Sequence, residues 1–426
     1  MYQKLADYYQ QGKSIKVGAA GAGWMGSGFA AAVKHVKGME LSILADEDTE
    51  KARKVMVEEG GAYPEEIVET DNPSEADDAL QKDKRVITGD ITMASSVESV
   101  DIVTDVTPSP ASGAEVAFSA IGKGKPVVLI NIEADVTVGP VLKMYAEKAG
   151  VMYTVSSGDE PGCLMELWDF VRCLGYEPVV IGKGKNNPLN SDATPDTVRE
   201  SAKKANKDPF QVASYVDGTK TMFEMSCVAN ATGCRPIQPG MIGPEADTKT
   251  VTEIFALKED GGITPFPGAV DFVQGSAMSG GVFITVRIPD ERISADLQYL
   301  KVGKGNYATF FRPYHLWFLE APISIAKAFF DNETTLVPFD KPAADVATVA
   351  KQDLSPGTVL DAFGGYTFFG RMDEKKNCIE AQALPVGLAP GAKIVKPAVK
   401  GEIITWSHVE LDESSTVVKL RREQDG

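Results

Sequence analysis

The stretch from Ile15 to Gly28, IKVGAAGAGWMGSG, constrains the fold of this chain more than any other. A short apolar run of the β type ends in a glycine-rich turn, and a helix-compatible run follows. The turn carries the GxGxxG spacing on Gly21, Gly23 and Gly26. In this context the first glycine permits the turn, the second lets a pyrophosphate approach the backbone, and the third lets helix and strand pack closely. We therefore predict a dinucleotide site over a merely structural glycine turn, and we include Trp24 and Met25 at the helix N-terminus.

A second apolar run, from Leu41 to Ala45, ends in Asp46, twenty positions after the last glycine of the turn. A carboxylate at this place accepts hydrogen bonds from the adenosine ribose. The two residues that follow are also acidic and would repel a 2′-phosphate: Glu47 and Asp48. The pattern therefore favours NAD, while Lys51 and Arg53 keep NADP open.

Further along, apolar runs alternate with a helix-like segment, which is typical of a parallel sheet with crossover helices. The runs are Ile102 to Val106 and Pro126 to Ile130, and residues 114 to 123 between them suit a helix. Other residues follow each run at the strand's carboxyl end, where such sheets bind ligands: Thr107, Pro108 and Asn131. We predict an α/β fold with an N-terminal Rossmann doubly wound sheet, and we place these three residues in the cofactor site.

The pattern of predicted helices and strands changes twice along the sequence, which suggests three domains. Residues 1 to 155 are expected to form the dinucleotide-binding Rossmann domain, beginning with a short amphipathic helix. Residues 156 to 334 mix helices and strands and are expected to form an α+β domain with the substrate pocket and an oligomer face. Residues 335 to 426 carry short β-type runs between Gly and Pro turns, which favours a small β domain. Within the first domain, the acidic stretch 58 to 85 is interpreted as helix and loop.

The composition excludes several classes of partner. With 43 basic and 60 acidic residues the formal charge is −17, which argues against nucleic acid or an anionic membrane. The first residues lack an apolar signal core, and no apolar run is long enough to span a bilayer. Five cysteines form no CxxC pair, which indicates reduced thiols in a cytoplasm. Three scattered histidines argue against a His-rich zinc site.

Several segments together carry a resemblance to a known family: the glycine turn, VVLINIEAD, GDEPG and GKGKNNP. With them the chain resembles the homoserine dehydrogenase-like oxidoreductases, and within these it is most similar to the branch called 1-deoxy-D-xylulose 5-phosphate reductoisomerase-like, or DXR-like. Near the C-terminus DLSPGTVL, LPVGLAPGAKI and KGEIITWSHVEL resemble a SAF domain, a compact β-clip module. The resemblance implies hydride transfer between a nicotinamide and a carbonyl or alcohol, in a homodimer or higher homo-oligomer.

The nicotinamide would bring the hydride chemistry, so the protein must supply a proton and hold the oxygen. The segment from Asp217 to Glu224 resembles the Asp and Lys catalytic stretch of homoserine dehydrogenases, although there the lysine follows its aspartate by four residues rather than three. If the segment is helical, Lys220 and Glu224 share one face and Asp217 lies one turn earlier. We predict catalytic roles for these three residues. An exposed i,i+4 ion pair is the alternative.

The GKGKNN segment is predicted to be a flexible, donor-rich loop after the strand at 179 to 181. Such a loop suits a phosphate, phosphonate or carboxylate, and a solvated basic turn is the alternative. We assign Lys183 to catalysis, and Lys185 and Asn187 to substrate binding.

Acidic residues follow two predicted strands, where they can converge at the sheet's carboxyl edge: Glu133, Asp135, Asp159 and Glu160. Paired carboxylates can hold Mg²⁺ or Mn²⁺, which would chelate a hydroxy-ketone. We take Asp159 and Glu160 as the candidate metal ligands and, with Glu133, as substrate-binding residues. Alternatively, Asp159 or Glu160 simply caps the helix that begins near Cys163.

Three further side chains complete the candidate substrate site. Arg312 is a cation close in sequence to His315, the one centrally located histidine. His315 can act as a general acid, donate a hydrogen bond to the substrate, or be a structural residue. Asn230 can orient a substrate, hydrogen-bond the nicotinamide amide, or merely cap a helix.

These observations predict a cytoplasmic NAD(P)-dependent oxidoreductase acting on a small polyhydroxylated, phosphorylated carbonyl compound. The sharpest version is 1-deoxy-D-xylulose 5-phosphate reductoisomerisation, in isoprenoid precursor synthesis. Homoserine dehydrogenases carry a lysine directly after the asparagine that here is Asn131, whereas this chain has Ile132 and then Glu133, so homoserine is the alternative beside a sugar acid or polyol. A nucleotide-responsive binding protein without catalysis is the alternative of another class.

Overall fold

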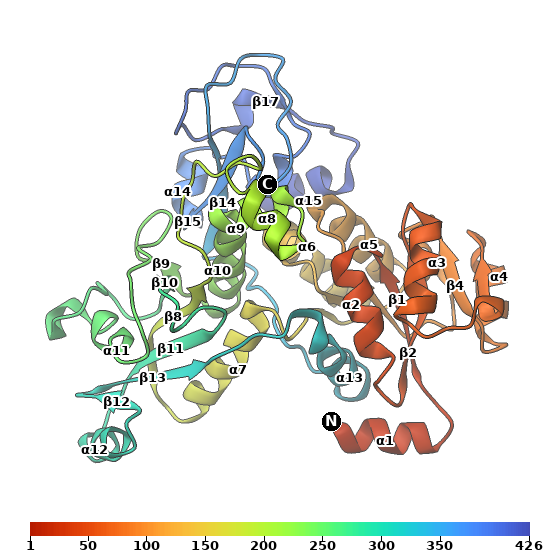
Figure 1. Ribbon diagram of the computed structural model, residues 1–426, viewed down its shortest axis with the longest axis horizontal. Coiled ribbons are helices and arrows are strands. Elements are labelled where there is room, and N and C mark those ends of the chain that lie inside the picture. Colours follow the sequence, from red (N-terminus) through yellow and green to blue (C-terminus); the bar gives the residue numbers. More distant parts are fainter. The chain divides into compact units, whose positions relative to one another are not determined.

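The computed structural model describes residues 1–426, and its contacts divide the chain into two interleaved units. The first unit comprises residues 1–162, 316–340 and 415–426, and the second comprises 163–315 and 341–414. Figure 1 traces the chain through its elements from red to blue. We expected three consecutive domains with boundaries near 155 and 334. Residues 341–414 instead cluster with the middle of the chain, for reasons that the buried polar contacts below explain.

The first unit is built on a seven-stranded sheet in the order β3-β4-β2-β1-β5-β6-β7, and every neighbouring pair is parallel. The strands are β1 (Ile15–Ala20), β2 (Met39–Ala45), β3 (Ile67–Glu69), β4 (Arg85–Thr88), β5 (Ile102–Asp105), β6 (Val127–Leu129) and β7 (Tyr153–Val155). The strand order reverses between β1 and β5, which creates the switch point where such sheets bind ligands. The predicted doubly wound Rossmann sheet is confirmed. Strands β3 and β4 begin inside the stretch 58 to 85 that we interpreted as helix and loop, because three or four residues between helices give too short an apolar run to detect.

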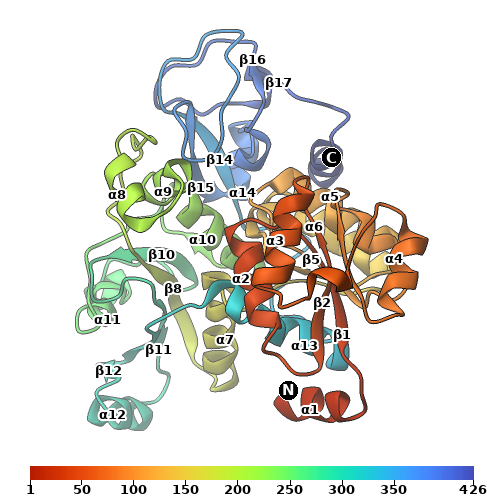
Figure 2. The same cartoon turned by 45° about the vertical axis from the view of Figure 1, so that its right-hand side comes forward.

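Helices cover both faces of this sheet (Figure 2). On one face α2, α3 and α13 share a core whose buried members include Phe29, Met56 and Ile325. Strands β5 and β6 pack against α5, and α15 packs against α5 and α6 outside them. The helices of this unit are α1 (Tyr2–Gln10), α2 (Trp24–Val33), α3 (Thr49–Glu58), α4 (Pro73–Leu80), α5 (Pro110–Gly122), α6 (Ile132–Ala149), α13 (Ala321–Asp331) and α15 (Thr416–Asp425), with short turns η1 (Pro64–Glu66), η2 (Met93–Ser96) and η4 (Trp317–Leu319).

The second unit is built on a six-stranded mixed sheet in the order β12-β13-β11-β8-β10-β9. The strands are β8 (Glu177–Lys185), β9 (Arg235–Pro236), β10 (Ala269–Gln274), β11 (Val282–Arg287), β12 (Gly303–Lys304) and β13 (Tyr307–Arg312). Strand β8 pairs in parallel with β10 and antiparallel with β11, so it is central. The helices associated with it are α7 (Glu160–Cys173), α8 (Arg199–Ala205), α9 (Pro209–Val216), α10 (Thr219–Thr232), α11 (Val251–Ile254) and α12 (Glu291–Tyr299), with η3 (Lys258–Asp260).

Residues 341–414 of the second unit form short β elements, as the sequence predicts. Strands β14 (Ala344–Ala350) and β15 (Phe368–Glu374) pair antiparallel, as do β16 (Lys393–Ile394) and β17 (Val409–Glu410). Isolated bridges such as Val349 to Ile403 join them, and α14 (Lys375–Glu380), η5 (Val386–Leu388) and η6 (Trp406–His408) fill the connections. The likeness of this region to a SAF domain stays a prediction.

This β region is fastened to α10 by buried polar contacts. Asn230 Oδ1 accepts a hydrogen bond from Ala344 N at 2.9 Å, and Thr219 Oγ1 accepts one from Gly370 N at 2.9 Å. Because unpaired buried polar groups are costly, these bonds hold β14 and β15 against α10. Residues 341–414 accordingly belong to the same compact unit as α10.

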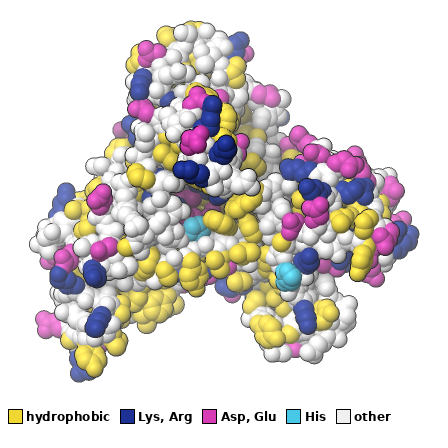
Figure 3. All heavy atoms as spheres, in the orientation of Figure 1, with side chains coloured by type: hydrophobic (Ala, Val, Ile, Leu, Met, Phe, Trp, Pro, Cys, Tyr) yellow, Lys and Arg dark blue, Asp and Glu magenta, His cyan; other side chains and the backbone are white.

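No helix combines the length and the apolarity that crossing a lipid bilayer requires. Figure 3 shows acidic side chains mixed with basic ones over the part of the first unit that carries α3 and α4.

Candidate functional site

The three glycines of the turn after β1 differ in whether the protein's own packing requires a glycine. Gly21 has φ +105°, a conformation that side chains rarely adopt. At Gly26 a Cβ would lie 1.9 Å from the carbonyl oxygen of Gly21, so only glycine lets α2 approach β1. Gly23 has φ −69°, and a Cβ there would meet nothing within 4 Å. The protein's own packing therefore requires the first and third glycines but not the second.

Gly23 is the N-cap of α2, and Trp24 and Met25 are the first two helical residues. The first N–H groups of a helix lack partners within the helix and carry the positive end of its dipole. The open space above Gly23 and these N–H groups together form a cradle that a phosphate can enter.

Asp46, directly after β2, is held firmly beside this turn. Its carboxylate accepts hydrogen bonds from Ala22 N at 2.7 Å and Asp48 N at 3.1 Å, and it pairs with the Lys51 ammonium at 3.1 Å. Arg53, by contrast, pairs with Glu69 at 2.7 Å. Of the two cations that keep NADP open, only Lys51 thus lies at the acidic residue.

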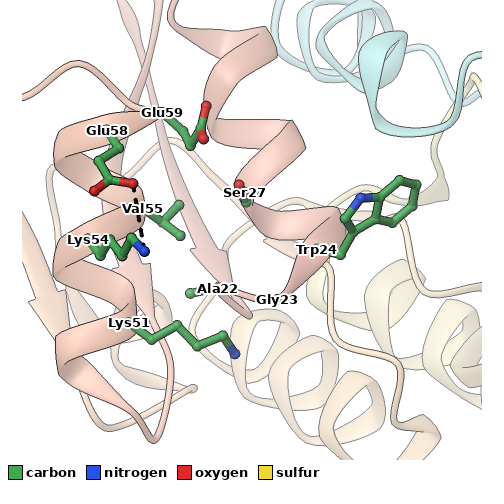
Figure 4. Close-up of a pocket in the computed structure, with 9 residues that line it drawn as sticks. All are labelled: Ala22, Gly23, Trp24, Ser27, Lys51, Lys54, Val55, Glu58 and Glu59. Atoms are coloured by element: carbon green, nitrogen blue, oxygen red, sulfur yellow. Dashed lines mark ion pairs between the residues drawn. The ribbon is translucent and has the colours of Figure 1, made fainter. Parts of the chain in front are cut away.

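A pocket opens between α2 and α3 beside these groups (Figure 4). It is lined by residues of the glycine turn, α2 and α3, and by the residue after α3: Ala22, Gly23, Trp24, Ser27, Lys51, Lys54, Val55, Glu58 and Glu59. In Figure 4, Gly23 lies between Lys51 on one side and Trp24 on the other.

The ends of β5 and β6 are joined by a buried polar network. The Asn131 amide donates to Asp105 Oδ2 at 2.8 Å and to the Ser109 carbonyl at 2.9 Å, while its oxygen caps α6 by accepting from Ala134 N. Thr107 Oγ1 also donates to Asp105, at 3.2 Å. Burial raises the pKa of Asp105 to about 7, against the lowering effect of these bonds. Asn131 and Thr107 thus shape the strand-end loop, and Pro108 is exposed on it.

In the second unit, Lys183 and Lys185 are not on a flexible loop as we predicted, because β8 runs on to Lys185 and both are buried. The intervening glycines show why. A Cβ at Gly182 would lie 2.2 Å from the carbonyl oxygen of Asp271, and one at Gly184 would lie 1.7 Å from that of Met278. Side chains alternate along a strand, so the two lysines project together from the other face. The loop prediction failed because glycine within a strand has the same sequence signal as glycine in a turn.

The two lysines have different partners. The Lys183 ammonium forms an ion pair with the buried carboxylate of Glu224 on α10. Lys185 Nζ donates to the carbonyl oxygens of Tyr215 at 2.6 Å and Asn187 at 2.8 Å. Burial, followed by repulsion from Lys183, lowers the pKa of Lys185 to about 8. Lys185 therefore adds a positive charge that no carboxylate hydrogen-bonds directly.

Asp217 is held by buried polar contacts. It precedes α10, where one carboxylate oxygen accepts from Thr219 N at 2.8 Å and the other pairs with Lys351 at 2.7 Å. The Lys351 ammonium also donates to the carbonyls of Ala193 and Gly365. Asp217 is 1% exposed, and this carboxylate joins the start of α10 to the residue after β14, so a catalytic role for it stays a prediction.

Two predicted substrate-binding residues also have structural partners. Asn230 is buried, and its side-chain oxygen holds the first residue of β14, as described above. Arg312 pairs with Glu166 at 2.8 Å and lies over the ring of Tyr314 at 4.8 Å. A role of either residue in substrate binding stays a prediction. Local sequence could not show the contact of Asn230, since Ala344 is far from it in the chain.

His315 and the residues after β8 meet at the same end of the second sheet. His315 Nδ1 lies 2.7 Å from the carbonyl oxygen of Gly280, in the turn between β10 and β11. In that turn Ser279 Oγ donates to Asn186 Oδ1 at 2.6 Å. Asn187 is half-buried, and its backbone carbonyl oxygen accepts a hydrogen bond from Lys185 Nζ. The turn between β10 and β11 thus contacts both His315 and the loop after Lys185.

The predicted metal ligands lie in the first unit. Asp159 is 7% exposed and precedes α7, and Glu160 is 4% exposed and is its first residue. On α6, Asp135 is buried and accepts from the Tyr153 hydroxyl at 2.8 Å, while Glu133 is half-buried in the first turn. Carboxylate oxygens are suitable ligands for Mg²⁺ or Mn²⁺, so the donor chemistry of Asp159 and Glu160 fits such an ion.

Residues 158–321 match the sequence model of the family described as oxidoreductase DRL, catalytic domain. The chain is an oxidoreductase. Nearly all the side chains weighed above for proton transfer, substrate or metal lie inside the match, from Asp159 and Glu160 through Lys183, Lys185 and Lys220 to His315. No curated protein matches the chain.

Solved structures that are similar include a "probable dehydrogenase" from Thermotoga maritima, with 13% identity over 75% of this chain and 90% of that chain and a TM-score of 0.43. A myo-inositol dehydrogenase from Corynebacterium glutamicum has 10% identity over 75% and 90% and a TM-score of 0.40. GenD2 from gentamicin A biosynthesis, in complex with NAD, has 13% identity over 77% and 90% and a TM-score of 0.38. With TM-scores below 0.5, these likenesses decide neither fold nor function.

Sequence reasoning missed two residues that contact the predicted ones. Asp105 is the last residue of an apolar strand, and Lys351 lies far along the chain from Asp217. An acidic residue inside an apolar run was an available signal for Asp105. The contact of Lys351 depends on long-range packing that no local pattern reports.

Proposed function

We propose that the chain is an NAD(P)-dependent oxidoreductase whose dinucleotide lies across the turn after β1. The observation that carries this proposal is Gly23, whose lack of a side chain no contact within the protein explains. A pyrophosphate at the N-terminus of α2 accounts for it. When bound, the nicotinamide would donate or accept the hydride.

NAD is the favoured dinucleotide, as the acidic residues after β2 suggest. Asp46 is oriented by Ala22 N and Asp48 N so that its carboxylate can accept from a ribose hydroxyl. Lys51 and Lys54 line the same pocket and provide the cations that a 2′-phosphate would need. A comparison of initial rates with NADH and NADPH at equal concentrations tests the preference.

The substrate we propose is a small polyhydroxylated carbonyl compound with an anionic group, such as a phosphate. The support comes from Lys185, a buried cation with only backbone carbonyls as hydrogen-bond partners, next to a second lysine. A charge of this kind is stabilised when an anion binds it. His315 and Asn187, at the same sheet end, are proposed to hydrogen-bond the hydroxyl groups.

The proton chemistry is proposed for the lysines that project from β8 and α10. An ammonium Nζ of Lys183 or Lys220 would donate a proton to the carbonyl oxygen as the hydride arrives. Glu224 is ion-paired with Lys183, so it would keep that ammonium protonated and oriented. In the reverse direction the same Nζ would accept the alcohol proton.

A divalent metal ion is part of the sharper proposal, in which the reaction is the reductoisomerisation of 1-deoxy-D-xylulose 5-phosphate. Asp159 and Glu160 would hold Mg²⁺ or Mn²⁺, which would polarise the hydroxy-ketone. The test is direct: the purified protein, Mn²⁺ and either reduced nicotinamide are mixed with this substrate, and absorbance at about 340 nm is followed. Absence of substrate-dependent oxidation rules out this version.

Plain dehydrogenation is the competing enzymatic function. A panel of polyols, sugar acids and homoserine with NAD⁺ and NADP⁺ separates it from reductoisomerisation, because only dehydrogenation reduces the cofactor without a metal-dependent rearrangement. The family match supports an enzyme over the nucleotide-responsive binding protein that the sequence also allows. A cytoplasmic homodimer remains our expectation, which light scattering and fractionation would test.

A further inference from the structure

An aromatic cluster in the first unit lies directly beside the glycine turn. Trp24, the first residue of α2, is half-exposed. Its ring centroid is 5.2 Å from that of Trp317 with an interplanar angle of 70°, and 5.8 Å from that of Phe318. Trp317 and Phe318 belong to η4, the segment by which the chain returns to the Rossmann unit.

The position of Trp317 is held against its own backbone preference. Its φ is +49°, in the left-handed region, where a bulky side chain is strained. The carbonyl of Gly158 compensates by accepting hydrogen bonds from both Leu316 N at 2.9 Å and Trp317 N at 2.7 Å. Ser157 Oγ donates to the carbonyl of Glu320 at 3.0 Å and fixes the other end of the segment.

Small residues bring η4 close to α2 and to the turn before α7. A Cβ at Gly28 would lie 2.1 Å from the ring of Phe318, and one at Gly158 would lie 1.9 Å from the carbonyl oxygen of Trp317. Trp24 and Gly28 are four residues apart on the helix and so share the face that η4 covers. The cluster is therefore rigidly placed rather than a chance surface contact.

The direction of the dinucleotide places one of its ends at this cluster. Asp46 and Lys51 mark the adenosine side of Gly23, and Figure 4 shows Trp24 pointing away on the opposite side. A dinucleotide whose pyrophosphate lies over Gly23 therefore extends its other half past Trp24. We propose that Trp24 and Trp317 form an aromatic wall that positions the nicotinamide half of the cofactor. This inference rests on the proposed dinucleotide site.

The test compares a ligand that has the nicotinamide with one that lacks it. Dissociation constants for NADH and ADP-ribose are measured by calorimetry for the native protein, Trp24→Ala, Trp317→Ala and Trp317→Phe. Each alanine variant is expected to weaken NADH binding about tenfold and to leave ADP-ribose binding within about twofold, because aromatic contact is lost only with the ring. Trp317→Phe should retain most of the NADH affinity. Trp168→Phe, on α7, is the matched control.

If the alanine variants lose affinity for NADH and ADP-ribose equally, or for neither ligand, the proposed aromatic wall is wrong. If the native protein binds neither NADH nor ADP-ribose, the proposed dinucleotide site itself fails, which is a separate outcome. A second measurement leaves Trp24 and Trp317 unmutated. In Trp168→Phe/Trp406→Phe protein, only Trp24 and Trp317 emit, and NADH should quench this emission more strongly than ADP-ribose does. Equal quenching would contradict the proposal.

Discussion

The Lys351 ammonium lies 2.7 Å from the Asp217 carboxylate, and their side chains are 3% and 0% exposed. The pair joins Asp217, in the turn between α9 and α10, to Lys351, which directly follows β14 far along the chain. Breaking a buried pair leaves one uncompensated charge, so Asp217→Asn or Lys351→Met should each lower the free energy of unfolding by about 3–5 kcal/mol. Urea unfolding measures the loss. The double variant should lose less than either single variant, and additive losses would contradict the pairing.

The glycine turn gives a prediction that separates ligand binding from folding. Gly23→Ala should change the free energy of unfolding by no more than about 1 kcal/mol, because its Cβ meets open space. It should nevertheless weaken NADH binding about tenfold or more by blocking the pyrophosphate. Gly26→Ala should cost about 1–3 kcal/mol of stability, because its Cβ would overlap Gly21. Full NADH affinity in folded Gly23→Ala protein would remove the main support for the dinucleotide.

Removal of the Lys183 ammonium should slow the reaction. We expect Lys183→Met to lower kcat/KM by about 10²–10⁴, the usual contribution of a positioned proton donor. Because the change also leaves Glu224 unpaired, Lys375→Met is the matched control. It breaks a pair with Asp345 at 3.0 Å in the same unit, and both lysine side chains are largely buried. If the two variants lose similar activity, Lys183 has no specific role.

Lys185 gives the protein a predicted pH dependence. Its pKa is lowered from 10.5 to about 8 by burial. Between these values the unfolded chain holds a proton that the folded chain has lost, so this group makes stability rise with pH in that window. Binding of an anionic substrate should behave in the opposite way and weaken about tenfold per pH unit above about 8. KM profiles of the native protein and Lys185→Met, which should lack this step, provide the measurement.

The pair between Asp46 and Lys51 should set the cofactor preference. Asp46→Ser removes the acceptor for the ribose hydroxyl and releases the Lys51 ammonium, which lies 3.1 Å away. We expect the ratio of kcat/KM for NADH over NADPH to fall about tenfold or more. Arg53→Ala should leave the ratio unchanged, because Arg53 pairs with Glu69. A shift in Arg53→Ala alone would show that the pair with Glu69 opens in solution.

The Rossmann sheet could be predicted because its signals are local: an apolar strand, a glycine turn and a helix follow one another within the first 33 residues. The lysines of β8 could be selected by residue type, but they were wrongly predicted to lie in a loop. Gly182 and Gly184 are glycines because the backbone carbonyls of Asp271 and Met278 approach them closely, and not because the chain turns there. The structural roles of Asp217 and Asn230 were out of reach, since their partners are Lys351 and Ala344. Hydrogen bonds between segments far apart in the chain produce no periodic pattern in the sequence, so they cannot be predicted from it.

Helix α15 connects the end of the sequence to the stability of the dinucleotide-binding unit. Arg421 is 1% exposed, and its guanidinium donates to the carbonyl of Thr137 on α6 at 3.1 Å. Gln424 and Glu423 contact Val141 and Tyr145 on the same helix. Residues 415–426 therefore cover one side of α6 and belong to the same compact unit as residues 1–162. A truncation that removes α15 would expose this side of α6 and destabilise the dinucleotide-binding unit, more than 250 residues away in sequence.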